Sequence, residues 1–355
     1  MRDSIREQPS AFSCRAAWLL AGCFLAPHAA VAYRFYPAGD EMIPSAAGAL
    51  RWGEDAFPLR FHLQDNIPEY FEETLWRNIA RDSLAEWDRV ITADISLRLE
   101  SGFAPGEEPS GTDDRFTIGW RADDDTFAGR ARWWSSVSTG RLAHCDIVMN
   151  SQWYQDRLDE GWDPEALEAR SRDTLVHEVG HCLGLAHTEP HPIPGWLAYF
   201  DDTPPIPAGF LPETVMSYGF SSRAVLTRDE TTGISLLYPT AAFTGSRGGV
   251  SGRVAGRRGP VPFHYVQAVY PGTRPRMGPG AFADERGVFH LEGLEPGTVL
   301  LWIHPILIHG ANAHGDMLVE AETSGGLDLV DQWQWVRITA GTTVGLPDIE
   351  LAPGR

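Results

Sequence analysis

Three histidines and one glutamate fall within eleven residues near the middle of the chain, in the run TLVHEVGHCLGLAHT (residues 174–188). His177 and His181 are four positions apart, so on a helix their imidazoles share one face and can bind one metal ion. Gly184 permits a left-handed turn that ends the helix and brings in His187 as a third ligand. Three imidazoles leave one coordination position open for water, which is the arrangement of a catalytic zinc site.

Glu178 directly follows the first of these histidines and lies about 100° round the helix from it. In that position it would take a proton from a water activated by the metal and pass it to the leaving amine of a peptide bond. The five residues together fit the pattern H-E-x-x-H-x-x-G-x-x-H, which has a chance of about one in ten thousand in a chain of this length. The pattern predicts a zinc-dependent hydrolase with Glu178 as its general base and acid.

This extended motif resembles that of the metzincin metallopeptidases, which carry a methionine turn further along the chain. The run TVMSYG (residues 214–219) is the matching segment. The resemblance implies that Met216 forms an apolar floor beneath the zinc histidines without binding the metal. It also gives Tyr218 a role seen in astacin-like and serralysin-like members, as a zinc ligand or a stabiliser of the oxyanion. A tyrosine that only packs is the alternative interpretation.

Other segments resemble the matrixin-like branch of the family, in the same order along the chain. These are a first strand, an amphipathic helix, two further strands and a closing helix, at residues 59–63, 68–90, 94–99, 146–150 and 226–239. The resemblance implies an α+β catalytic domain in which a mixed twisted sheet supports the zinc helix. It also implies an edge strand, near residues 130–136, that receives the substrate as an added strand.

Two features depart from the matrixin pattern. The ligand set of the matrixin structural zinc is not recognisable beyond His144 and Asp146. The span between His187 and Met216 holds seven prolines, and this insertion should shape the substrate pocket in a way that the resemblance cannot supply.

Length and charge predict two domains with different surfaces. The chain has 355 residues, a net charge of -19 and no lysine, which argues against binding to nucleic acid or to an anionic membrane. Residues 33–240 hold 17 Arg against 35 Asp and Glu, a net charge of -18, whereas residues 241–355 hold 9 against 11, a net charge of -2. The change falls in a stretch rich in Gly, Ser and Arg, so residues 241–260 are expected to be a linker and domain entrance.

The C-terminal part is predicted to be a small all-β domain over residues 261–355, with a first strand that begins as early as residue 248. Its short β-branched and aromatic runs are separated by Gly and Pro, which favours an antiparallel sandwich. The expected strands are residues 250–254, 261–270, 287–291, 299–304, 317–321, 335–339 and 349–352. The run GVFHLEGLEPGTVLLWI (residues 287–303) resembles the transthyretin-like regulatory domain attached to carboxypeptidases, which implies a binding or spacer module.

The first 32 residues have the pattern of an export signal. Arginines precede an apolar stretch at residues 16–26, and a small-residue triplet follows at residues 30–32, so cleavage is expected before Tyr33 and the protein is expected to be secreted or periplasmic. A lipoprotein signal that anchors the chain through Cys23 is the alternative. No apolar run of 18 residues occurs, so no transmembrane helix is expected.

Two cysteines remain after removal of this segment. Cys145 and Cys182 can form one disulfide in an oxidising compartment, and two buried free thiols are the alternative. Two acidic clusters, residues 113–114 and 123–125, could hold Ca²⁺ through carboxylate oxygens, although solvated loop carboxylates are commoner.

These observations favour an exported zinc endopeptidase whose partner is a peptide or protein substrate. A surface-binding protein that uses the β-domain, with the peptidase fold as a scaffold, is an alternative from another class. A zinc hydrolase of non-peptide amides is a third hypothesis. The oligomeric state and the peptide preference are not indicated by the sequence.

Overall fold

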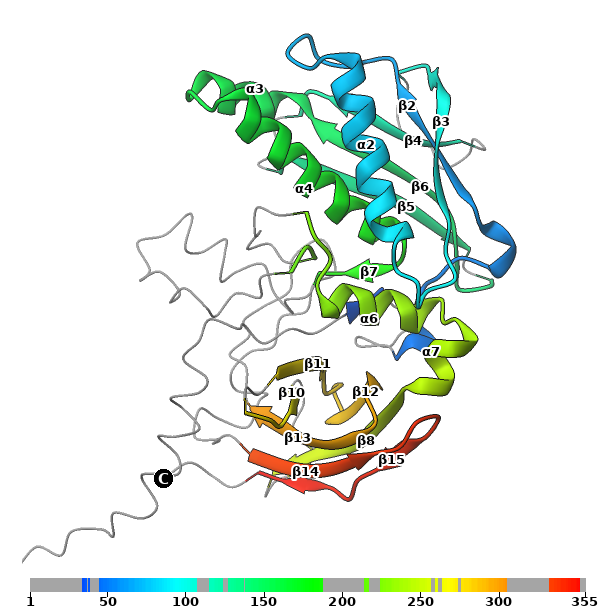
Figure 1. Ribbon diagram of the computed structural model, residues 1–355, viewed down its shortest axis with the longest axis vertical. Helices are drawn as coiled ribbons and strands as arrows, with labels where there is room; N and C mark the ends of the chain where they lie inside the picture. The colour runs from blue at the N-terminus through cyan, green and yellow to red at the C-terminus, as the bar shows by residue number, and fades with distance from the viewer. Residues whose placement is uncertain are drawn as a thin grey trace, which may run out of the picture.

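The computed structural model consists of an N-terminal domain with a central sheet and helices, followed by a second domain built from strands (Figure 1). The fold is therefore mixed α and β, as the sequence predicts. The expected signal segment lies outside the described residues. These residues are 34–36, 38, 45–106, 115–123, 127–136, 138–187, 214–216, 224–256, 259–260, 264–273, 276–304 and 332–351.

A five-stranded mixed sheet forms the frame of the N-terminal domain, with the strand order β3-β2-β4-β6-β5. Four strands run parallel, and β5 runs antiparallel to β6 at one edge of the sheet. The bounds are β2 (Leu59–Gln64), β3 (Leu97–Ala104), β4 (Phe116–Arg121), β5 (Gly129–Ser136) and β6 (Arg141–Asn150). The edge position of β5 matches the expectation for residues 130–136.

The helix α2 (Glu73–Asp88) packs its apolar stripe against the sheet and against α4. Trp76, Ile79, Leu84 and Trp87 are buried at spacings of three to five, which places them on one side of the helix. The indole N–H of Trp87 donates to the backbone carbonyl of Val176 in α4, at 2.9 Å. This contact satisfies a buried polar atom and fixes α2 along the helix that carries the histidines.

The helix α4 (Pro164–Cys182) begins with Asp163, whose side chain accepts a hydrogen bond from the backbone N–H of Ala166 at 2.7 Å. It follows α3 (Ser151–Asp159), and every residue from Asp173 to Cys182 is buried. The second half of α4 is therefore interior: it packs beside α2 and against β5 and β6 of the sheet (Figure 1).

Gly184 ends this helical region with a φ of +99°, as the sequence predicts. A Cβ on this residue would lie 2.5 Å from the backbone oxygen of Leu50. Both the left-handed backbone and the lack of space therefore require glycine here. The chain then forms the short strand β7 (Leu185–Ala186), which pairs with β1 (Arg34–Phe35).

Residues 241–260 were expected to be a linker and domain entrance, with a first strand as early as residue 248, and their described part contains regular secondary structure. They form α7 (Ala241–Ser246), β8 (Gly248–Gly256) and β9 (Gly259–Pro260). The preceding helix, α6 (Arg228–Leu237), starts with a capping box between Thr227 and Glu230. The β-domain thus begins at Gly248, directly after two helices that join it to the first domain.

Two sheets make up the C-terminal domain and share one hydrophobic core. One sheet has the order β11-β10-β13-β14; in the other, β12-β8-β15 is extended by β9 and β16, which both pair with β8. The bounds are β10 (Tyr265–Tyr270), β11 (Arg276–Phe282), β12 (Val288–Leu294), β13 (Gly297–His304), β14 (Gln332–Ile338), β15 (Thr343–Gly345) and β16 (Ile349–Glu350). The strand expected at residues 317–321 lies outside the described residues.

The strand β11 was not expected, because its sequence RMGPGAF contains two glycines and a proline. It is an edge strand that pairs only with β10 in the described part of the chain, and an edge tolerates proline. Gly278 also lies against Tyr270, where a Cβ would come within 2.5 Å of the ring. Glycine therefore serves close packing here rather than a turn.

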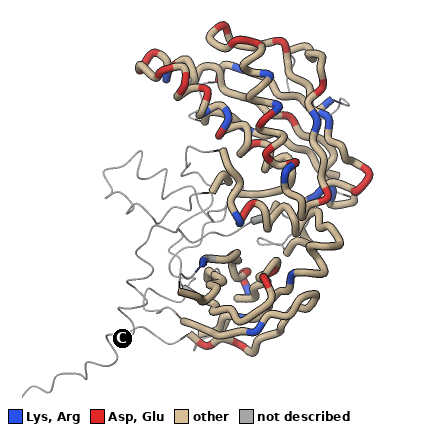
Figure 2. The backbone as a smooth tube through the Cα atoms, viewed as in Figure 1, with Lys and Arg blue, Asp and Glu red and all other residues tan. Residues whose placement is uncertain are grey.

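Charged residues are more frequent along the backbone of the N-terminal domain than along that of the β-domain (Figure 2). This distribution agrees with the asymmetry of charge along the sequence. None of the described helices is both long enough and apolar enough to span a membrane.

Candidate metal centre and cleft

A cavity of about 320 Å³ lies between the exposed edge of the sheet and α4. Its walls come from the N-terminal segment, from β5 and the residues before it, from α4 and from the loop after α4. The lining residues that matter for chemistry are Tyr36, Arg130, Trp133, Arg170, His177, Glu178, His181 and His187. The predicted histidines and glutamate therefore meet in one cleft.

The three histidines converge through their Nε2 atoms. The Nε2 atoms of His177 and His181 are 3.0 Å apart, and they lie 3.2 Å and 3.1 Å from the Nε2 atom of His187. His177 and His181 are 4% and 6% exposed. In the described part of the chain, this is the one cluster of three or more His, Cys, Asp or Glu whose ligand atoms lie close enough to share an ion.

Backbone carbonyls orient two of the rings. The Nδ1 atom of His177 lies 2.6 Å from the carbonyl oxygen of Val215, and that of His181 lies 2.8 Å from the carbonyl oxygen of Leu185. Because a carbonyl can only accept, Nδ1 carries the proton in both rings and Nε2 keeps its lone pair. Burial, together with the neighbouring histidines, lowers the pKa of His177 well below its usual value, so this ring stays neutral.

This donor set fits a metal ion. Nε2 lone pairs that face one another at about 3 Å repel unless a cation lies between them. A tetrahedral ion with metal–nitrogen distances of about 2.0–2.1 Å separates its ligand nitrogens by roughly 3.3 Å, close to the spacing observed. Imidazole nitrogen suits zinc, copper, iron and nickel. The geometry thus indicates a three-histidine metal site without selecting the metal.

Glu178 lies beside this cluster and is 5% exposed. One of its carboxylate oxygens accepts a hydrogen bond from the backbone N–H of Ala131 in β5, at 2.7 Å. Burial raises the pKa of Glu178 to about 8, although this hydrogen bond and the charges of Arg130 and Arg170 act in the opposite direction. The carboxyl group is therefore held in place by the edge strand and is able to exchange a proton near neutral pH.

The end of the histidine helix is fixed by contacts with remote elements. The indole N–H of Trp52 donates to the carbonyl of Cys182 at 2.7 Å, and the Tyr238 hydroxyl donates to the carbonyl of Leu183 at 2.8 Å. Both carbonyls belong to the last turn, which has no helical partners for them. Cys182 also forms a disulfide with Cys145 in β6, which confirms the predicted bridge. The helix that carries His177 and His181 is thus anchored to the sheet covalently.

The segment around Met216 lies against the histidine helix. A Cβ on Gly180 would come within 2.3 Å of the Met216 sulfur, so this methionine packs on the helix between the two metal histidines. The backbone N–H of Met216 donates to Glu230 at 3.0 Å. Because Glu230 also completes the capping box of α6, one buried carboxylate connects that helix to the methionine segment.

Three cleft residues were missed by the sequence analysis. The Tyr36 hydroxyl lies 3.1 Å from Nδ1 of His181, and Arg130 and Arg170 bring positive charge to the cleft. Tyr36 reaches the site because β1 pairs with β7, a contact across about 150 residues that no local pattern reports. Arg130 is paired with Asp123 at 2.7 Å.

Several predicted features lie outside the described residues. These are Tyr218, the proline-rich segment before Met216 and four of the five acidic residues considered for calcium, Asp113, Asp114, Asp124 and Asp125. The fifth, Asp123, pairs with an arginine. His144 and Asp146 contact each other at 3.0 Å inside the protein, and Thr117 donates to the same carboxylate.

No protein-family model and no curated protein matches this chain. Among solved structures, the GM1-bound ECX AB5 holotoxin matches at 12% identity, covering 58% of this chain and 88% of that one, with a TM-score of 0.34. The Bacillus anthracis TIE protein matches at 10% identity, covering 30% of this chain and 17% of that one, with a TM-score of 0.21. A DUF3823 family protein from Parabacteroides merdae matches at 14% identity, covering 31% and 47%, with a TM-score of 0.21. Scores this low indicate neither the fold nor the function of the chain.

Proposed function

We propose that this protein is an exported zinc-dependent endopeptidase with a metzincin-like catalytic domain of the matrixin-like branch. The observation that carries the proposal is the convergence of three imidazole Nε2 atoms beside a buried glutamate in an open cleft. Two carbonyl-bound rings and a disulfide-anchored helix support it, because a catalytic site needs its ligands held in advance. The order of motifs along the chain supports the family assignment.

His177, His181 and His187 would hold the zinc. Zinc, when bound, supplies a Lewis acid that polarises a peptide carbonyl and lowers the pKa of a water molecule. Glu178 takes a proton from the attacking water, whose oxygen bonds to the carbonyl carbon. Glu178 then delivers the proton to the amide nitrogen as the carbon–nitrogen bond breaks, giving a carboxylic acid and an amine. The N–H of Ala131 keeps the carboxylate on the cleft side during both transfers.

The peptide would bind as an added strand along β5. This strand is at the edge of the sheet, and its residues Arg130 and Trp133 line the cleft. An extended peptide at such an edge gains main-chain hydrogen bonds whatever its sequence. Tyr218 would bind the zinc or stabilise the oxyanion, or else only pack. The C-terminal sandwich would serve as a binding or spacer module.

The metal assignment can be tested on purified residues 33–355. Wild type is expected to hold about one zinc per chain by atomic emission and to cleave an unbiased peptide library. His181→Ala should lose both the zinc and the cleavage, whereas His290→Ala, which removes an exposed histidine of the β-domain, should keep both. Zinc retained at one equivalent in His181→Ala would contradict the ligand assignment. Wild type that binds zinc but cleaves no peptide would favour the binding-protein or non-peptide hypotheses.

A further inference from the structure

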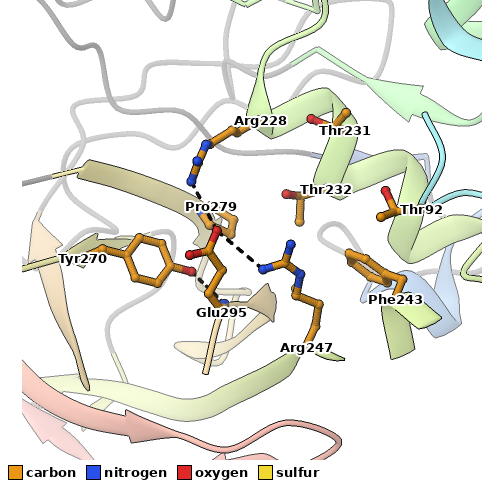
Figure 3. Close-up of a pocket in the computed structure, with 10 residues that line it drawn as sticks. Thr92, Arg228, Thr231, Thr232, Phe243, Arg247, Tyr270, Pro279 and Glu295 are labelled. Atoms are coloured by element: carbon orange, nitrogen blue, oxygen red, sulfur yellow. Dashed lines mark hydrogen bonds and ion pairs between the residues drawn. The ribbon is translucent and has the colours of Figure 1, made fainter. Parts of the chain in front are cut away.

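A second cavity, of about 190 Å³, lies where α6 and α7 meet the β-domain, and none of the described residues lines both this cavity and the cleft. Figure 3 shows this cavity in close-up, with side chains from both domains around it. Its lining residues are Thr92, Arg228, Thr231, Thr232, Phe243, Arg247, Tyr270, Pro279, Gly293 and Glu295.

Three arginines contact one carboxylate, that of Glu295. Arg228 and Arg247 line the cavity, whereas Arg276 reaches Glu295 from outside the described lining. One oxygen of Glu295 lies 3.3 Å from Arg228 and 3.5 Å from Arg247, and the other lies 3.0 Å from Arg276. Each guanidinium carries five N–H donors, so the three together far exceed what one carboxylate can accept. None of them makes a two-pronged pair with Glu295 among the described contacts, although one guanidinium could satisfy a carboxylate in that way.

Aromatic rings help to place two of these guanidiniums. Arg247 lies over the Phe243 ring at 5.9 Å from its centroid, and Arg276 lies over the Tyr270 ring at 5.1 Å. Nε of Arg247 is buried and has no hydrogen-bond partner among the described residues. In Figure 3 the guanidinium of Arg247 lies between Glu295 and Thr232. The positive groups are therefore positioned by more than their contact with the carboxylate.

The charge of this cavity is opposite to that of the chain, which carries -19 overall. Glu295 is the one acidic residue among the described residues that line it, and Glu292 lines an adjoining cavity that shares Arg247. Burial alone would raise the pKa of Glu295, but the hydrogen bond from Arg276 and the nearby arginine charges outweigh it and lower that pKa. The two guanidiniums that line the cavity exceed its one lining carboxylate, and Arg276 also pairs with that carboxylate, so an excess of positive charge remains.

We propose that this cavity binds a tetrahedral oxyanion, a phosphate or sulfate group, between the N-terminal domain and the β-domain. Such a group offers several acceptor oxygens to the donors that Glu295 leaves unused on Arg247 and its neighbours. Thr232, on α6, also lines this cavity (Figure 3). The cavity is independent of the histidine cluster, so this inference does not rest on the proposed peptidase activity.

Solvent access sets the strength of this binding. The side chains of Arg228, Arg247 and Arg276 are 60%, 31% and 47% exposed, so their attraction for an anion is screened and weakens as salt is added. Because contacts come from both domains, an occupied site stabilises the folded chain in proportion to ligand concentration. The free ion and a phosphate ester share this chemistry, and the experiment separates them.

The test measures thermal unfolding of the full chain against inorganic phosphate, sulfate, glycerol phosphate and acetate at fixed low ionic strength. A saturable rise in the melting temperature with phosphate or sulfate, and no saturable rise with acetate, is expected. Glycerol phosphate that acts as well as phosphate would identify an ester as an equal ligand, and its failure would identify the free ion.

Variants assign the effect to this cavity. Arg247→Gln and Arg276→Gln should each raise the half-saturating phosphate concentration at least tenfold. Glu295→Gln, which removes the competing carboxylate, should lower it. Arg253→Gln is the matched control, because Arg253 pairs with Asp348 elsewhere on the β-domain, and it should leave binding unchanged. A melting temperature that does not saturate with phosphate in wild type would overturn the proposal. So would phosphate binding as tight as that of wild type in Arg247→Gln or Arg276→Gln, provided that the variant folds.

Discussion

The histidine cluster and the arginine cluster hold their functional groups in opposite ways. The histidines come from one short stretch of chain, two of them are almost fully buried, and their orientation depends on backbone carbonyls. The arginines come from three separate elements, are partly exposed, and meet at a single side chain. Buried contacts fixed by the backbone and by a disulfide therefore make the histidine cluster sensitive to small changes, whereas solvent screening makes the arginine cluster tolerant of them.

The largest change in stability is expected from loss of the disulfide. Cys145 and Cys182 are 37 residues apart in sequence, and closing a loop of that length in the unfolded chain contributes about 3–4 kcal/mol. The variant Cys145→Ala with Cys182→Ala should lose that amount in urea unfolding, and wild type treated with reductant should match it. A loss below about 1 kcal/mol would show that the bridge does not anchor the histidine helix.

A smaller loss is expected from Gly180→Ala. Alanine favours a helix by about 1 kcal/mol over glycine, but its Cβ here would lie 2.3 Å from the Met216 sulfur and 2.8 Å from Trp87. Overpacking should therefore destabilise the protein by about 1–3 kcal/mol and weaken metal binding. Gly245→Ala in α7 is the control, because no atom of the described residues lies within 4 Å of the added Cβ, and it should be neutral or stabilising. Equal effects of the two variants would argue against tight packing under the histidines.

Asp173 is expected to make stability depend on pH. Burial raises its pKa to about 6, despite favourable contacts with Arg170, the Ala224 N–H and Arg172. The folded protein thus binds this proton more tightly than the unfolded chain, so ionisation costs stability as the pH rises from about 4, and the full cost is present above about 6. Asp173→Asn should gain on the order of 1 kcal/mol relative to wild type between pH 4 and pH 7. A difference that stays constant over this range would contradict the assignment.

The smallest effect is expected in the arginine cluster. Glu295→Gln should cost less than about 1 kcal/mol, because exposed ion pairs gain little over hydrated charges. The difference from wild type should shrink further in 0.5 M salt, because the Debye length falls to about 4 Å and the ion pairs are screened. Urea unfolding at low and high salt measures both quantities. A loss of stability above about 2 kcal/mol that salt does not reduce would show that the Glu295 carboxylate acts as a buried contact and not as a screened ion pair.

The histidine cluster could be predicted from sequence because its residues are local. The spacing of His177, His181 and Gly184 reflects helix periodicity and one left-handed turn, and the structure has both. The disulfide followed from the count of cysteines left after the expected signal. Most strands of the β-domain followed from short apolar runs between turns, but β9, β11 and β15 did not. In β11, Gly278 serves packing against Tyr270.

Contacts between distant parts of the chain could not be predicted in this way. Tyr36 meets His181 across 145 residues, and Glu230 reaches back to Met216 from the start of another helix. Arg228 and Glu295 are 67 residues apart and belong to different domains. No periodicity or spacing relates such residues, since their contacts follow from how sheets and helices pack.

The most direct test of the central proposal is peptide cleavage by wild type and Glu178→Gln, with zinc measured in both. Glutamine can still accept the Ala131 N–H but cannot take a proton, so cleavage should fall by about 10²–10⁴-fold while one zinc is retained. Glu168→Gln is the matched control, since Glu168 pairs with Arg172 on the same helix, and it should cleave like wild type. Cleavage by Glu178→Gln at the wild-type rate would contradict the proposed mechanism.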